Sequence, residues 1–230
     1  MTAMTSPARL PSAVRRHVSF DAFAEAHRVV FAQVRVFFPD ADFVVPSLAR
    51  VSSEARDGTP EHCRADRDYY DTAEFDLAAD GVALRWDGQG QEWTAVLPAA
   101  SVTGRPIRCE AGYPGTGESV PDPVHRLLHP YLHRLSIEKV ARVSSRRLTR
   151  PLIGLVGIRL ADVIDDDVVA TRVDGEQRTH RSICVEVRDL DGPGRKVLAD
   201  VSTLLIHSGC RTEAPMAELA RAFGAPPRSP

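Results

Sequence analysis

Long apolar runs, paired cysteines and a strong excess of charge of one sign are all missing from this chain. None of its apolar stretches approaches the roughly 20 residues that a helix needs to cross a bilayer, so no membrane partner is expected. The four cysteines are far apart and form no C-x-x-C pair, which argues against a zinc clip and a disulfide scaffold. A formal net charge of −2 gives no bulk attraction for nucleic acid, so no nucleic-acid partner is expected either.

Lysine is scarce, because Lys139 and Lys196 are the only two lysines among 29 basic residues. The other basic residues are arginines, whose guanidinium groups suit planar oxyanions. In a chain rich in alanine and proline, a GC-rich genome is the simpler explanation of this bias. Composition alone therefore assigns no ligand.

The two ends of the chain are predicted to lie outside the folded domain. The first residues, MTAMTSPARLPSAVRRH, carry basic side chains without a following apolar stretch, which is not typical of a secretory signal. We expect a disordered leader over residues 1–18, one domain over 19–224 and a disordered tail over 225–230. A cytoplasmic location follows from the same reasoning.

Local patterns predict a mixed fold. Ser19 followed by apolar residues at three- and four-residue spacing predicts a helix over 19–31, and alternation predicts a strand over 33–38. The polar segment 49–67 has no period and is predicted to be a loop. Asp165 to Asp167 are expected to form a solvated turn. Further strands in hairpin order are predicted at 69–72, 81–87, 92–97, 106–110, 137–147, 151–164, 167–173 and 179–188.

Helical spacing recurs over 124–135, where Pro130 must bend the helix, and again over 197–207 and 216–223. About eight strands joined by tight turns are antiparallel and can close into a barrel wide enough for a ligand. The predicted fold is therefore α+β: an eight-stranded antiparallel β-barrel with helices at the N-terminus, in the middle of the chain and at the C-terminus.

Several segments between about residues 33 and 224 combine into a recognisable pattern. The most specific run is Tyr69-Tyr70-Asp71-Thr72, Gly81 to Arg85 and Trp93 to Pro98, and the others are Val140 to Arg147, Leu160 to Asp166 and Pro215 to Gly224. In order and spacing they resemble the CYTH (triphosphate tunnel) superfamily. The resemblance implies an eight-stranded tunnel in which acidic and basic side chains bind a divalent metal and a triphosphate. It also implies hydrolysis of triphosphate compounds or cyclisation of ATP.

The chain departs from the family at the charged positions that the resemblance implies. The Glu-x-Glu-x-Lys of the first strand aligns with Gln33, Arg35 and Phe37. One basic hairpin position is kept at Arg85, whereas others align with non-basic residues. The remaining departures are Asp87 and Val96 at basic positions, Ser182, Cys184 and Glu186 at a late Glu-x-Glu-x-Glu, and Glu218 at a late lysine.

Because side chains alternate along a strand, the strand positions in this set are predicted to face the lumen. Glu186 and Asp87 are the candidates for a general acid or base, since burial raises a carboxyl pKa. Alternatively, Arg35–Glu186 and Arg85–Asp87 are ion pairs that merely fill the tunnel. The expected ligand-binding residues are Arg35, Phe37, Arg85, Glu92, Val96, Arg146 and Cys184, and no metal-binding residue is assigned.

Three functions are compatible with such a lumen. The favoured one is a tunnel that binds a small organic molecule and catalyses a metal-independent cyclisation or isomerisation, without cofactor. The second is a divergent phosphohydrolase that uses Mg²⁺ or Mn²⁺ with Arg85, Arg146, Asp162, Asp165 and Glu186. The third is a non-catalytic module that binds a protein or polyphosphate. The sequence leaves the oligomeric state open.

Overall fold

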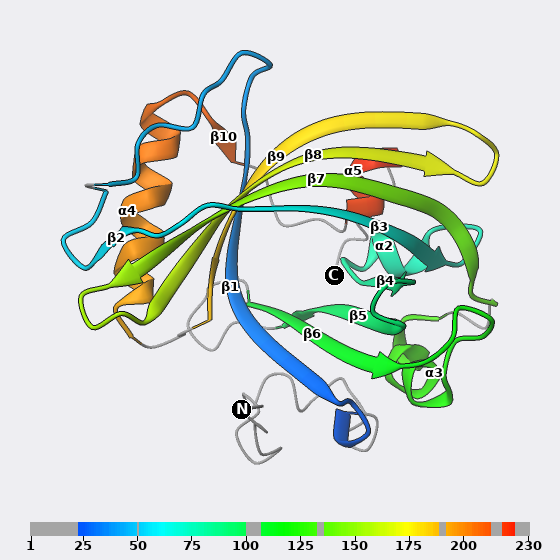
Figure 1. Cartoon of the computed structure of the whole chain (residues 1–230). Helices are drawn as coiled ribbons and strands as arrows, with labels where there is room; N and C mark the ends of the chain where they lie inside the picture. Colours follow the sequence, from blue (N-terminus) through cyan, green and yellow to red (C-terminus); the bar gives the residue numbers. More distant parts are fainter. Residues whose placement is uncertain are drawn as a thin grey trace.

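The computed structural model in Figure 1 describes residues 23–49, 51–99, 107–132, 136–188, 192–212 and 218–223. Its strands are β1 (Arg28–Phe38), β2 (Ala55–Asp57), β3 (Glu61–Asp71), β4 (Ala83–Asp87), β5 (Glu92–Ala99), β6 (Ile107–Pro114), β7 (Glu138–Gly154), β8 (Arg159–Arg172), β9 (Gln177–Val187) and β10 (Arg211–Thr212). Its helices are α2 (Asp76–Ala79), α3 (Asp122–Leu128) with the single turn η3 (His129–Tyr131), α4 (Gly194–His207) and α5 (Glu218–Phe223). Among these helices none is long and apolar enough to cross a membrane.

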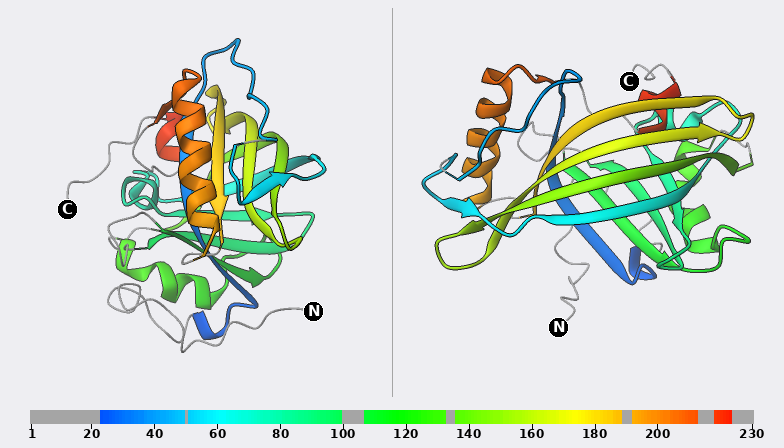
Figure 2. Two further views of the ribbon diagram at one scale, coloured as in Figure 1. Left: turned by 90° about the vertical axis from the view of Figure 1, so that its left-hand side faces the viewer. Right: turned by 45° about the horizontal axis from the view of Figure 1, so that its top comes forward.

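Eight of the strands close into an antiparallel barrel in the order β1-β6-β5-β4-β3-β7-β8-β9. Closure depends on β1, which pairs with β6 along its first half and with β9 from Gln33 to Phe37. The short strands extend this wall, since β2 pairs with the end of β7 and β10 with the end of β1. Figure 2 shows the long curved strands β7, β8 and β9 on one side of the barrel. The predicted eight-stranded fold with helices is confirmed.

Strands β7 and β8 form a continuous hairpin, which corrects two predictions. The predicted strand over 151–164 spans the end of β7, a turn and the start of β8, and Gly157 adopts a φ of 81° in that turn. The predicted turn at Asp165 to Asp167 is wrong, because these residues lie within β8. Arg181 pairs with Asp165 on one face and Arg147 with Asp166 on the other, so both carboxylates are neutralised within the sheet.

Two predictions near the N-terminus are also wrong in part. The predicted helix over 19–31 fails at Arg28, where β1 begins, although Phe23 and Ala24 are helical and 19–22 lie outside the described residues. The predicted loop over 49–67 contains β2 and most of β3. The first residues of β3 are exposed and polar, so they carry no apolar alternation, yet they pair with β7 from Glu61 onward. The predicted leader 1–18 and tail 225–230 lie outside the described residues.

The helices cover the barrel on the outside and at one end. Helix α4 buries Val201 and Leu205 against Phe37 of β1 and the outward-facing Ile183 and Val185 of β9. Figure 2 shows this helix running along the barrel wall. A second apolar cluster places α3 against β4, β5 and β6 around Trp93 and Tyr113.

Helix α5 packs at the opposite end from α4, next to α2 (Figure 1). Its Leu219 and Ala220 belong to an apolar cluster with Val168 and Ala170 of β8. These two β8 side chains share a strand face with Asp162 and Asp166, which line the central cavity. The inner face of the barrel is therefore apolar at this end and covered by α5.

Asp71, the last residue of β3, holds the chain as it turns into α2. Its Oδ1 accepts hydrogen bonds from the backbone N–H groups of Thr72 (2.7 Å) and Leu77 (2.9 Å), and its Oδ2 accepts one from Ala78 (2.9 Å). Burial raises the pKa of Asp71 to about 6, although the three backbone donors act in the opposite direction. The Tyr69-to-Thr72 motif thus has a structural role at this corner.

The raised pKa of Asp71 predicts a pH-dependent stability. The folded state binds the proton more tightly than the unfolded chain, so this contribution is fully present below the ordinary pKa of 3.8 and is lost as the pH rises through about 6. The unfolding free energy of the wild type, relative to Asp71→Asn, should fall by about 3 kcal/mol at most from about pH 4 to about pH 7. Urea denaturation of both proteins across this range measures the difference, and parallel pH profiles would contradict it.

Candidate binding site in the barrel lumen

A cavity of about 500 Å³ lies inside the barrel and is lined by residues of all eight barrel strands. This volume falls within the range of roughly 300–1,000 Å³ that is usual for small-molecule pockets. Alternation along the strands decides which side chains reach it: β9, for example, contributes His180, Ser182, Cys184 and Glu186. Part of the wall is apolar, with Val30, Val34 and Val36 of β1, Val96 of β5 and Ile164 of β8.

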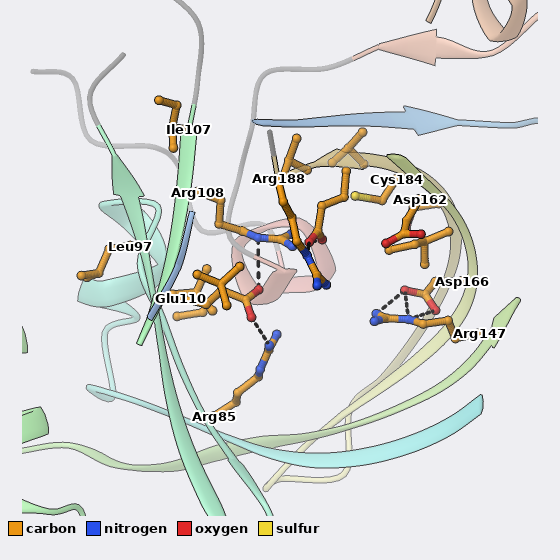
Figure 3. Close-up of a pocket in the computed structure, with 18 of the residues that line it drawn as sticks. Arg85, Leu97, Ile107, Arg108, Glu110, Arg147, Asp162, Asp166, Cys184 and Arg188 are labelled. Atoms are coloured by element: carbon orange, nitrogen blue, oxygen red, sulfur yellow. Dashed lines mark hydrogen bonds and ion pairs between the residues drawn. The ribbon is translucent and has the colours of Figure 1, made fainter. Parts of the chain in front are cut away.

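Charged side chains dominate the rest of the lining. Figure 3 shows the side chains of Arg85, Arg108, Arg147 and Arg188 reaching into the cavity from different parts of its wall. Among the described residues, the lining contains seven arginines and four carboxylates, a formal excess of positive charge. They are Arg28, Arg67, Arg85, Arg108, Arg147, Arg159 and Arg188, with Glu110, Asp162, Asp166 and Glu186.

Glu110 of β6 lies among four of these arginines. Arg85 donates to its Oε2 over 3.1 Å, Nε of Arg108 lies 3.1 Å from its Oε1, and Arg28 lies at 4.0 Å. Burial alone would raise the pKa of Glu110, but Arg85, Arg108, Arg28 and Arg67 together lower it to about 2. The carboxylate is therefore ionised throughout the physiological pH range.

The other three carboxylates are also engaged by arginines. Arg108 donates from its Nη2 to Glu186 over 2.7 Å, and Arg188 donates to the same carboxylate over 3.2 Å. Arg147 donates two hydrogen bonds to Asp166, over 2.9 Å from Nε and over 2.6 Å from Nη2. Figure 3 shows the contact between Arg147 and Asp166 on a different part of the cavity wall from Arg108. Charged groups thus connect strands that are not neighbours in the sheet.

The fourth carboxylate, Asp162, bears on whether the lumen could hold a divalent cation. It is the cross-strand neighbour of Glu186, so two carboxylates lie side by side. Asp162 accepts a hydrogen bond from Arg159, and burial raises its pKa in spite of that partner. A hard cation needs several oxygen ligands and would have to displace the guanidinium groups that already hold these oxygens. Among the described residues no group of three or more His, Cys, Asp or Glu side chains could hold a metal ion. The residues present do not fit such an ion.

Four of the predicted site residues line the cavity: Arg85, Val96, Cys184 and Glu186. Cys184 lies beside Arg108 and Arg147, and burial is the main reason why its pKa is raised to about 11. Its thiol is therefore protonated at neutral pH.

The predicted register of β1 is wrong by one residue. Val34 and Val36 line the cavity, whereas Arg35 is exposed and Phe37, with 0% exposure, packs under α4 on the outer face. Gln33 is buried and is not part of the cavity lining. The expected apolar replacement inside the lumen at Phe37 is thus overturned.

Strand β7 shows the same one-residue slip, since Arg146 is exposed and Arg147 lines the cavity. Asp165, proposed for a phosphohydrolase, pairs with Arg181 away from the cavity. The two ion pairs expected inside the tunnel are replaced by others: Arg85 pairs with Glu110, and Glu186 pairs with Arg108 and Arg188.

The other two predicted site residues lie at the turn end of the β4–β5 hairpin, outside the cavity lining. Asp87 accepts hydrogen bonds from the backbone N–H groups of Gln89 and Gly90, so it stabilises the turn between β4 and β5. Glu92 pairs with Arg28 and with His27 at the edge of the lumen.

Six of the seven lining arginines were not singled out from the sequence, among them Arg108 and Arg147. Glu110 was missed as well. Arg108 and Glu110 stand two residues apart in a segment predicted to be a strand, and that spacing places both on one face. The alternation of side chains along the predicted strand could therefore have predicted that Arg108 and Glu110 lie on the same face.

Comparison with known proteins gives distant matches. No family model matches the sequence. The chain is 26% identical over 196 residues to two uncharacterized proteins of Mycobacterium tuberculosis, Rv2226 of strain H37Rv and MT2285 of strain CDC 1551. The match covers 79% of this chain but only 38% of each relative, so the chain spans well under half of their length.

Two solved structures are similar at low scores. A candidate adenylate cyclase from Bacillus halodurans has a TM-score of 0.44 and 12% identity, covering 70% of this chain and 83% of that one. The RNA triphosphatase Pct1 of S. pombe has a TM-score of 0.25 and 9% identity, covering 86% and 89%. The barrel itself is established by the strand pairing within this chain.

The register of β1 predicts different stability effects for neighbouring residues. Phe37→Ala removes a fully buried ring beneath α4 and should lower the unfolding free energy by about 3–5 kcal/mol. Val36→Ala, at the wall of the cavity, should cost less than about 1.5 kcal/mol. Urea denaturation of both variants tests this order, and similar losses for the two would contradict the assigned faces of β1.

Proposed function

We propose that this chain is a CYTH-like tunnel protein that binds a compact polyanion, a small molecule carrying an oligophosphate group, in its lumen. The observation that carries the proposal is the set of seven arginines that, in the described part of the chain, line the cavity beside only four carboxylates. Guanidinium groups make charge-assisted, often paired hydrogen bonds to phosphate oxygens. A cavity with excess positive charge needs a counter-anion, and a phosphate chain supplies one.

The arginines that are paired with lumen carboxylates still have N–H donors that a ligand could use. Arg147 binds Asp166 through Nε and Nη2, so Nη1 makes no hydrogen bond to that carboxylate. A guanidinium has five N–H donors in a planar fork, so a pair with one carboxylate does not exhaust it. Arg147 keeps 32% of its side-chain surface accessible, and that surface faces the cavity. An anion in the cavity can therefore contact Arg147 without breaking its ion pair.

The apolar strip of β1 and β5 favours an organic oligophosphate over a purely inorganic one. Val30, Val34 and Val36 stand along β1, and Val96 stands on β5. A phosphate group makes no favourable contact with this apolar surface. An apolar or aromatic group attached to the phosphate would bury the surface away from water, which is favourable. A neutral organic ligand is less well supported, because it would leave the excess positive charge uncompensated.

Binding is better supported than proton transfer in this cavity. Glu186, the carboxylate expected to act as acid or base, accepts hydrogen bonds from Arg108 and Arg188. These partners occupy lone pairs that a general base would use to accept a proton from the substrate. Asp87, the other candidate, lies in a turn outside the cavity lining. The proposal therefore concerns recognition and assigns no bond-breaking step.

Removing one lumen arginine should weaken polyanion binding, and the neighbouring arginine provides a matched control. A hydrogen bond to a charged group contributes about 1.5–3 kcal/mol, so Arg147→Gln should raise the Kd for tripolyphosphate by about 10- to 100-fold. Arg146→Gln makes the same change one residue away on the exposed face and should alter the Kd by less than about twofold. Isothermal titration calorimetry at low salt measures both, with thermal unfolding to check that each variant is folded. Equal effects, or no binding by the wild type, would contradict the proposal.

Magnesium should compete with the protein for the ligand. Each lumen carboxylate is held by arginine, so the cavity should bind the metal-free anion. A chelated phosphate chain carries less negative charge and offers fewer free oxygens to guanidinium groups. Titration of tripolyphosphate and ATP in EDTA should give a lower Kd than titration with excess Mg²⁺. Tighter binding with Mg²⁺ would show instead that the carboxylates take part in metal binding.

A further inference from the structure

Glu110 occupies the place among the lumen arginines that an anionic ligand would need. Its carboxylate lies 3.1 Å from nitrogens of both Arg85 and Arg108 and 4.0 Å from Arg28, and only 14% of its side chain is exposed. Figure 3 shows the carboxylate between Arg85 and Arg108, with their guanidinium groups directed at it. In geometry and charge, this arrangement is that of an arginine cluster with an anion already bound.

We propose that Glu110 is an internal counter-anion that sets a charge threshold for ligands of the tunnel. Weakly charged anions, such as orthophosphate, cannot compete with the carboxylate for Arg85 and Arg108. Anions with several charges can, because they also contact lumen arginines that Glu110 does not reach. This inference rests on the proposed function and adds a residue that determines which anions are accepted.

The backbone holds Glu110 in this position. Its strand β6 runs between β1 and β5, where Glu110 is paired with Val30 on one side and Val96 on the other. Both neighbours line the cavity and are apolar, so neither offers the carboxylate a hydrogen bond. A ligand that takes over the guanidinium groups must therefore compensate for the carboxylate that it displaces, which raises the charge it needs.

Arg108 adds an imperfect contact that a ligand could improve. Its Nη2 donates to Glu186, but its Nε, although 3.1 Å from Glu110, lacks hydrogen-bond geometry with it and is buried without another partner. A buried donor without an acceptor is costly, and an incoming phosphate oxygen could satisfy it. The contact between Arg108 and Glu110 is thus the part of the cluster that is easiest to exchange.

The charge threshold that Glu110 sets for ligands is the same at every physiological pH, because the carboxylate stays ionised. The surrounding arginines keep its pKa near 2, so the carboxylate does not become neutral when the cell acidifies. Orthophosphate carries only about −1.5 charges near neutral pH, which is close to the single charge of the residue it would replace. A triphosphate chain carries several charges along its length, so its remaining phosphates still gain contacts when one of them replaces Glu110.

Neutralising Glu110 tests the threshold directly. Glu110→Gln keeps the size of the side chain and removes its charge, so the affinity for orthophosphate should rise at least about tenfold, the effect of one charge-assisted hydrogen bond. The affinity for tripolyphosphate should rise by a smaller factor, so the ratio of the two Kd values should shrink. Calorimetric titrations of both anions, at one salt concentration, give this ratio for each protein.

Two further variants act as controls. Glu176→Gln removes a charge from a partly exposed carboxylate whose partners, Arg172 and Arg178, lie outside the cavity lining, so it should leave the ratio within about twofold of the wild type. Glu110→Asp keeps the negative charge and should keep the preference for tripolyphosphate. The Asp variant also guards against a Gln variant that fails to fold, because it should discriminate against orthophosphate as the wild type does.

The outcomes separate this inference from the proposed function. Tripolyphosphate binding by the wild type, with an unchanged ratio in Glu110→Gln, would overturn the threshold and leave the proposed function standing. Binding by Glu110→Gln alone would support an internal counter-anion that blocks the site permanently, and would overturn the proposed function. If neither protein binds either anion, both proposals are wrong.

Discussion

The pairing of arginine with carboxylate inside a closed wall of strands is the interaction on which this structure depends. Ionised groups withdrawn from water are strongly unfavourable unless opposite charges and hydrogen bonds compensate them. Here Arg85, Glu110, Arg108 and Glu186 form a chain of contacts across the lumen, from β4 through β6 to β9. The chain stabilises charged side chains that could not be buried singly, and it fixes the spacing of strands that share no hydrogen bonds. The excess of arginine that remains gives the cavity lining a positive formal charge.

The barrel could be predicted because most of its strands alternate apolar and polar residues between tight turns. The predictions failed where that signal was weak. The first residues of β3, Glu61 to Arg67, carry charged or polar side chains on both faces and no large apolar one, so they show no period of two, and pairing with β7 makes them a strand. The residues before β1 mimic helical spacing, and the chain becomes a strand at Arg28 because β6 offers an edge to pair with.

The site was harder to predict because a shift of one residue exchanges the two faces of a strand. Strand β1 has apolar residues on both faces, Val36 inside and Phe37 outside, so hydrophobicity could not decide which face was which. Arg146 and Arg147 are adjacent and chemically identical, and only their partners distinguish them. By contrast, Arg85 and Glu186 lie on strands whose registers the turns define, and both were placed correctly. Most lumen arginines were missed because Arg108 of β6 and Arg147 of β7 were not assigned to the inner face.

The apolar cover that α5 places over one end of the barrel makes the two ends of the lumen chemically different. Leu219 and Ala220 of α5 pack there with Val168 and Ala170 of β8, whereas Asp162 and Asp166 lie further along the same strand face in the charged part of the lining. A charged molecule that approached past the apolar residues would lose water before it met a compensating side chain, which is energetically costly. An approach along the charged part of the lining avoids that cost.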